Sequence, residues 1–398
     1  MDNEICQAYG YLLGRLLVLR QQRLDFEGEG MDWNRLDHRD PGGVSWVNPN
    51  LDVAYSEAWV AVGEAGGAML EIPPIEDRYF TWQMLDGWGE TLLNINERTF
   101  PDHPSGRFAL CLAGSGVAVP DGAVRIDLPV RASRVLMRVE LGSDPAEAVR
   151  LQHAFTLTPF GDPRPPQRIE APLFGNRELP GVDAFDLAPA ILAAGDDDGM
   201  AEPRAAVTEV AELLRSDPAA REWVDRVIAE QARPELRRRL QSVGRIENGW
   251  MCPTVIGRYG GDYWMRTVAN LTGIWANTTD EYLGFVATGR DGGAVHTVTY
   301  PPERLPGSAA RYFWSVTAVD SRDFLVIPNP IDRHALGSRS PLEHNVDGSL
   351  TLVFAPSRPA DHPGANWLPT PDGGRYNLTY RVYGPRDPDY VPPPLERR

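Results

Sequence analysis

The sequence contains no lysine, and all 39 of its basic residues are arginine. This absence excludes functions that need a primary amine, such as the Schiff-base lysine of pyridoxal phosphate enzymes, the P-loop lysine, the kinase strand lysine and the Ser-x-x-Lys nucleophile pair. Arginine remains for bidentate recognition of carboxylates or phosphates, but it does not transfer protons near neutral pH. The high arginine and alanine content is typical of a bacterial, GC-rich genome.

Cysteine is also scarce. The three cysteines, Cys6, Cys111 and Cys252, are too few and odd in number for a disulfide framework, which favours a reducing compartment such as the cytoplasm. The seven histidines are scattered, and the closest pair, His334 and His344, does not have the spacing of metal ligands. We therefore expect no metal site and no cofactor.

The chain is acidic, because 39 arginines stand against 55 Asp and Glu residues and give a net charge of −16. Its positive charges form no basic stripe, so nucleic acid is not an expected partner. No apolar stretch approaches the roughly 20 residues of a membrane span, and the acidic N-terminus lacks the basic start of a signal peptide. We expect a small molecule as the ligand, and the composition leaves a homo-oligomer open.

Two regions of strand pattern with a helical segment between them predict the domain organisation. Short apolar runs between residues 44 and 140 are typical of antiparallel strands, and strand patterns return from residue 250. Helical spacing covers residues 203–244, and residues 3–20 form an apolar helical face that must dock. We predict a fold that is mainly β with α, in which two β-sandwich or jelly-roll-like modules are joined by a helical segment. The predicted regions are an N-terminal helix with the first β-sandwich module (1–158), a Pro/Asp-rich connector (159–202), the helical segment (203–244) and the second β-sandwich module (245–398).

Five segments gather Asn, Asp, Arg and aromatic residues and are the candidates for a functional site. They read NPNLDVAY (48–55), DRYFTWQMLDGWGE (77–90), GRYGGDYWMRT (257–267), IPNPIDRHALGSR (327–339) and GANWLPTP (364–371). In the third segment, Asp262 and Arg266 are four residues apart, a spacing that on a helix favours a local ion pair. In the fifth, Trp367 either fills a gap in the second module or forms the wall of a pocket.

The second of these segments has the alternation of a strand. Tyr79, Thr81 and Gln83 share one face, and Arg78, Phe80 and Trp82 share the other. The face with the polar residues either lines a pocket or is an ordinary solvated face of the sheet.

These segments resemble a known pair of protein families. NPNLDVAY, DRYFTWQMLD and NERT resemble domain of unknown function 1254, and YFWSVTAVD, NPIDRHALGSR, DGSL, ANWLPTP and YRVYGP resemble its usual C-terminal companion, domain of unknown function 1214. The resemblance covers most of residues 44–385 and implies two sandwich-like modules joined by helices. This chain has Asn50-Leu51-Asp52-Val53 where the first family usually reads Asn-Asn-Asp-Thr.

The first functional hypothesis is a metal-independent enzyme that acts on a small polar or glycosidic molecule. A carboxylate would act as general acid or base, and an arginine would hold an anionic group. The candidate catalytic acids are Asp52, Asp86 and Asp332, and the candidate anchors are Arg78, Arg266 and Arg333. The other candidate substrate-binding residues are Asn50, Trp82, Gln83, Asn329 and Trp367.

The alternative hypothesis is a non-catalytic protein that binds a small molecule or carbohydrate. Trp82, Trp88, Trp314 and Trp367 would stack on flat apolar faces, while Asn and Arg side chains fix the orientation of the ligand. A deep pocket that encloses two carboxylates favours catalysis, whereas a shallow aromatic groove favours binding.

Overall fold

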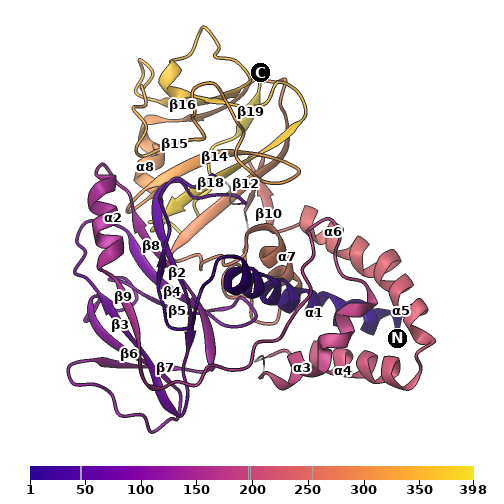
Figure 1. Ribbon diagram of the computed structural model, residues 1–398. Coiled ribbons are helices and arrows are strands. Elements are labelled where there is room, and N and C mark those ends of the chain that lie inside the picture. The colour runs from indigo at the N-terminus through magenta and orange to yellow at the C-terminus, as the bar shows by residue number, and fades with distance from the viewer. Residues whose placement is uncertain (45–46, 196, 198, 253) are drawn as a thin grey trace.

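The computed structural model of the chain describes residues 1–44, 47–195, 197, 199–252 and 254–398. Figure 1 shows two β-rich halves, one above the other, with a group of helices beside them. The chain enters through a long helix, builds the first β half, then the helices, and ends in the second β half. The prediction of a mainly β chain with helices is confirmed, and its classification as sandwiches or jelly rolls stays a prediction.

The first β half contains two sheets, with strand orders β1-β2-β8-β4-β5 and β7-β6-β3-β9. Apolar side chains of both sheets, such as Trp82 and Met137 from one and Leu70 and Phe108 from the other, meet in one core. The strands are β1 (Asp37–His38), β2 (Val53–Ala61), β3 (Ala65–Ile72), β4 (Phe80–Leu85), β5 (Thr91–Ile95), β6 (Gly106–Leu112), β7 (Val124–Leu128), β8 (Ala132–Glu140) and β9 (Thr156–Asp162).

The second β half also contains two sheets, with strand orders β10-β11-β12-β18-β14-β15 and β17-β16-β13-β19. Its core combines Phe285 and Tyr380 from the first sheet with Val298 and Phe354 from the second. The strands are β10 (Arg245–Glu247), β11 (Trp250–Cys252), β12 (Tyr282–Asp291), β13 (His296–Tyr300), β14 (Trp314–Asp320), β15 (Ala335–Gly337), β16 (Leu350–Ala355), β17 (Trp367–Pro369), β18 (Arg375–Tyr383) and β19 (Leu395–Arg397).

Several helices begin where the sequence supplies a cap. Asp144 accepts a hydrogen bond from the backbone of Glu147, and Asp262 accepts one from Met265, so each carboxylate caps a helix N-terminus. The α-helices are α1 (Asp2–Arg23), α2 (Pro145–Ala154), α3 (Ala188–Ala193), α4 (Ala201–Ser216), α5 (Ala220–Val227), α6 (Arg233–Gln241), α7 (Tyr263–Gly273) and α8 (Pro306–Ala309). Short 3-10 or π turns are η1 (Leu24–Gly28), η2 (Val182–Leu187), η3 (Ile228–Ala232), η4 (Pro302–Arg304) and η5 (Gly364–Asn366).

Helix α1 is the centre of the helical region. It packs against α4 and α7, and its residues 8–14 are all buried, so it is covered on all sides there and not on one apolar face alone. Its contact with α7 is close because Gly10 and Gly14 face Trp264 and Thr267, and the Thr267 hydroxyl donates to the Gly10 carbonyl at 2.8 Å. Within the described residues, no helix combines the length and the apolar character that crossing a membrane requires.

We expect Gly10→Leu to lower the free energy of unfolding by about 3 kcal/mol, because even a Cβ at this position would overlap the buried Trp264 ring. Gly28→Leu is the control, since nothing lies within 4 Å of a Cβ there. Urea denaturation of both variants measures the effect. Equal stability of the two variants would contradict the close contact of α1 with α7.

Candidate functional site

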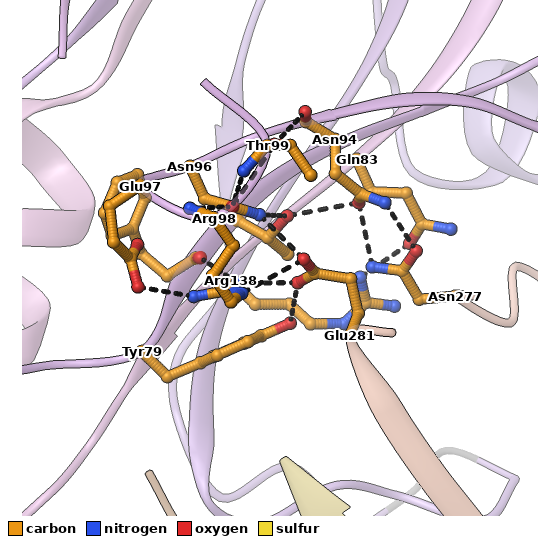
Figure 2. Close-up of polar contacts among 12 residues, drawn as sticks. Tyr79, Gln83, Asn94, Asn96, Glu97, Arg98, Thr99, Arg138, Asn277 and Glu281 are labelled. Carbon is orange, nitrogen blue, oxygen red and sulfur yellow. Dashed lines mark hydrogen bonds and ion pairs between the residues drawn. The ribbon is translucent and has the colours of Figure 1, made fainter. Parts of the chain in front are cut away.

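The polar face of β4 lies at the contact between the two β halves. Phe80 and Trp82 point into the core of the first half, as the alternation predicts. The opposite face, with Tyr79, Thr81 and Gln83, is fully buried, so it is not a solvated face. Its polar groups meet the chain that leads into β12, as Figure 2 shows.

Glu281 is the centre of this contact, which we call the polar seam. Its carboxylate accepts hydrogen bonds from Arg98 Nη2 at 2.7 Å, from Asn96 Nδ2 at 2.9 Å and from the Tyr79 hydroxyl at 3.0 Å. The Arg98 guanidinium lies close to the Tyr79 and Tyr312 rings, 4.9 and 5.0 Å from their centroids. Burial and the charge of Glu281 raise the pKa of Tyr79, so its hydroxyl remains a donor at neutral pH.

Amide groups continue the seam on both sides of Glu281 (Figure 2). Asn94 and Asn277 donate to each other at 3.0 and 2.9 Å. Gln83, one of the predicted substrate-binding residues, donates to Thr91 and to the Ala276 carbonyl and accepts from Arg138 at 2.6 Å. Because these buried side chains use each other as partners, the seam joins the halves and leaves Gln83 little capacity to bind a ligand.

A second polar group forms where the β4–β5 hairpin meets α1 and α7. We call it the acid–arginine cluster, and its members are Arg15, Asp86, Glu90, Asp197 and Arg266. The turn of residues 86–90 can approach α1 and α7 this closely because it contains Gly87 and Gly89. A side chain at these positions would meet Arg15 and Asn270. It thus combines a predicted catalytic acid, Asp86, with a predicted anchor, Arg266.

Arg266 is held in the interior by Asp197. Its two terminal nitrogens donate to the two Asp197 oxygens at 3.1 and 2.6 Å, and its guanidinium lies 5.0 Å from the Trp88 ring centroid. The predicted local pair with Asp262 is wrong, because the Asp262 carboxylate instead caps α7. Arg266 Nη1 is also 3.5 Å from Glu90 Oε1, so two carboxylates share one cation.

Glu90 is the titratable member of the cluster. Burial raises its pKa to about 7, while the hydrogen bond from the Tyr259 backbone and the charge of Arg266 oppose the rise. Its Oε2 accepts from Tyr259 N at 2.9 Å, and its Oε1 has no hydrogen-bond partner among the described residues. The side chain is 18% exposed, while the Oε1 atom itself is buried.

The Asp86 carboxylate holds the turn of the β4–β5 hairpin. Its Oδ1 accepts hydrogen bonds from the backbone nitrogens of Trp88 and Glu90 at 2.8 and 2.9 Å, which close the hairpin turn. Burial raises the pKa of Asp86, and these backbone hydrogen bonds and Arg266 oppose that rise.

The remaining predicted residues lie in two other neighbourhoods. Asp52 pairs with Arg339 at 3.2 Å, and the Asn50 amide donates to the Tyr383 hydroxyl at 2.8 Å. Arg78 binds the carbonyls of Glu140 and Leu141 beside them. This group lies at the contact of the two β halves.

The last neighbourhood brings together the segments 327–339 and 364–371. Arg333 donates to the carbonyls of Gly364 and Trp367, and Asn329 bonds the backbone of Arg333. The Asp332 carboxylate is 97% exposed and contacts His334. Trp367 is half-buried, and its indole nitrogen donates to the Ala355 carbonyl at 2.9 Å.

Sequence reasoning missed Glu90, Asp197 and Arg15. The signal for Glu90 was its place four residues after Asp86 across a glycine-rich turn, which brings both carboxylates to one end of a hairpin. Asp197 and Arg15 carried no such signal, because they come from distant parts of the chain.

Among the described residues, neither the hollows nor any group of possible metal ligands contributes further residues to these sites. The larger of the two main hollows in the described part of the chain, about 340 Å³, is lined by Glu247, Arg304 and Asp389 and by none of the predicted residues. Among the described residues, no group of three or more His, Cys, Asp or Glu side chains is arranged to hold a metal ion.

Comparison with solved structures supports the fold. The VPA0106 protein from Vibrio parahaemolyticus is similar over 100% of both chains, with a TM-score of 0.67 and 15% identity. An uncharacterised protein from Burkholderia cenocepacia is similar over 97% of this chain and 86% of its own, with a TM-score of 0.47 and 14% identity. No curated protein matches the chain.

Family comparison covers both β halves. Residues 33–159 match the family described as Protein of unknown function (DUF1254). Residues 287–387 match the family described as Protein of unknown function (DUF1214). The chain is therefore a member of the tandem DUF1254–DUF1214 proteins, with the first domain N-terminal and the second C-terminal.

Proposed function

We propose that this protein is a metal-independent enzyme that acts on a small polar or glycosidic molecule by proton transfer at the acid–arginine cluster. The observation that carries the proposal is Glu90, a partly exposed carboxylate that shares the Arg266 cation with Asp197 and whose Oε1 forms no hydrogen bond among the described residues. A carboxyl group with a pKa near 7 is half ionised at neutral pH, so it can accept a proton in one step and return it in the next.

The neighbouring groups have complementary roles in this proposal. Asp86, held by the hairpin backbone, is the second carboxylate beside Glu90. Arg266 supplies positive charge that stabilises the ionised form of Glu90, and Arg15 supplies a second cation at the Gly87 carbonyl. Burial raises the pKa of both carboxyl groups, and a carboxyl group with a raised pKa can serve as a general acid or base near neutral pH.

The tryptophan-based binding hypothesis has less support. Trp82, Trp88 and Trp314 are buried, at 0%, 6% and 4% exposure, so they are not available to stack on a ligand at the surface. Asp332, Asn329, Arg333 and Trp367 lie in a separate neighbourhood and are not part of the proposed mechanism. We also propose a cytoplasmic location, which the three free cysteines favour.

The raised pKa of Glu90 predicts a dependence of stability on pH. Because the pKa is about 7 in the folded chain against an ordinary 4.5, the folded state holds a proton that the unfolded chain has released between these values. The contribution is therefore present below pH 4.5 and is lost as the pH rises through 7. We expect the wild type to lose roughly 2–3 kcal/mol more than Glu90→Gln between pH 5 and pH 8.

Denaturant unfolding at pH 5, 6, 7 and 8 measures this difference. Glu76→Gln is the matched control, because Glu76 is exposed. Parallel pH profiles for the wild type and Glu90→Gln would show that Glu90 titrates normally, which would remove the basis of the proposal.

The catalytic role predicts a large effect of the same variant on turnover. A thermal-shift screen of small hydroxy acids, sugars and aryl glycosides, followed by product analysis of each hit, identifies a substrate. We expect Glu90→Gln to lower kcat/KM about 100-fold or more, because it removes the acid–base group. The wild-type kcat/KM should change with an apparent pKa near 7, and Glu76→Gln should match the wild type. Full activity of Glu90→Gln would contradict the proposal.

A further inference from the structure

Two buried arginines at the contact of the β halves have no acidic partner. Arg138 lies on β8 of the first half and Arg381 on β18 of the second, and each is 6% exposed. Arg138 donates to the Gln83 side-chain oxygen and to the Trp275 carbonyl, and Arg381 donates to Thr317 Oγ1 and the Asn48 carbonyl. Within the described part of the chain, neither guanidinium forms an ion pair with a carboxylate.

The other two buried arginines show what this fold normally does with such a charge. Arg134 and Arg266, each 1% exposed, both pair with carboxylates, the first with Glu57 and the second with Asp197. A buried charge without a counterion costs several kcal/mol, and neutral acceptors satisfy its hydrogen bonds but do not neutralise it. Arg138 and Arg381 therefore provide two positive charges that the described residues leave uncompensated.

Tyrosine residues lie near these two charges. The Arg138 guanidinium lies 5.3 Å from the Tyr55 ring centroid, and Tyr282 stacks on Tyr383 at 5.6 Å. Burial raises the pKa of Tyr282 and of Tyr383, and the positive charges of both arginines oppose that rise, so both arginines act on the same hydroxyls. These hydroxyls are protonated at neutral pH and supply hydrogen bonds but no negative charge.

The tyrosine cluster is partly open to solvent. Tyr55 and Tyr282 are half-buried, as are Asn48 and Asn50 in the loop beside them. Asn50 donates to the Tyr383 hydroxyl at 2.8 Å, and Asn48 accepts from Thr379 at 3.2 Å, so this loop lies directly against the cluster.

We propose that this cluster binds a small organic acid, with its carboxylate at Arg138 and Arg381 and its flat body against the tyrosine rings. Arginine matches a carboxylate with two parallel hydrogen bonds, and two guanidiniums from different halves would hold it from two sides. Aromatic rings supply the apolar contact that an inorganic anion does not need. The site differs from the acid–arginine cluster and does not depend on catalysis at Glu90.

Isothermal titration calorimetry at constant ionic strength tests the site with defined probes. The acids are benzoate and glucuronate, their neutral counterparts are benzamide and glucose, and sulfate is the inorganic anion. We expect at least one of the acids to bind the wild type at least tenfold more tightly than its neutral counterpart and than sulfate. Arg138→Met and Arg381→Met should each weaken that binding at least tenfold, and Arg237→Met, at an exposed arginine, should not.

Any other outcome of these titrations contradicts the proposal. Equal binding of acid and neutral probe would show that the guanidiniums are not the recognition groups, and equal binding of sulfate would show that the organic body is not recognised. If a methionine variant does not fold, Arg138→Gln or Arg381→Gln takes its place, because glutamine retains a hydrogen-bond donor. The comparison of probes on the wild type needs no variant. Unchanged binding by Glu90→Gln separates this site from the proposed catalytic one.

Discussion

The position of the two β halves depends on one buried charge, the carboxylate of Glu281. This residue is 1% exposed and belongs to the second half of the chain, whereas Arg98, Asn96 and Tyr79, which donate to it, belong to the first. A buried carboxylate is tolerated only when its oxygens are paired, and removal of one partner of such a pair typically costs about 3–5 kcal/mol. The Glu281 carboxylate therefore fixes how the halves meet, because an arrangement that buries it without these donors would leave the charge unpaired.

The seam also determines what lies on either side of it. Through Gln83, the same network contacts Arg138 in one direction and Thr91, next to Glu90, in the other. The tyrosine cluster and the acid–arginine cluster are thus built on a shared set of hydrogen bonds. The tyrosine cluster takes Arg138 from the first half and Arg381 from the second, so it is a property of the joined chain.

The sequence was informative about local patterns and silent about distant partners. Alternation assigned Phe80 and Trp82 to one face of β4, because burial in a two-sheet core leaves a period of two. The sequence could not show what covers the opposite face, since its partners Ala276 and Glu281 lie about 200 residues further on. Asp262 and Arg266 gave a false local pair for the same reason: Asp197, which is far away in sequence, is the stronger partner. Asp86 and Arg266 were found by residue type, but only the fold adds Glu90 to them.

The central place of α1 has a consequence for the order of synthesis. This helix leaves the ribosome before α4 and α7, yet it is buried by them, and α7 ends about 250 residues after α1. At a usual rate of about 5–20 residues per second, an apolar helix therefore waits on the order of tens of seconds for the surface that will cover it. During that interval Leu12, Leu13, Leu16 and Leu17 are accessible to chaperones and to other nascent chains. The final assembly of this protein is thus a late event, in which α1 is enclosed by segments made much later.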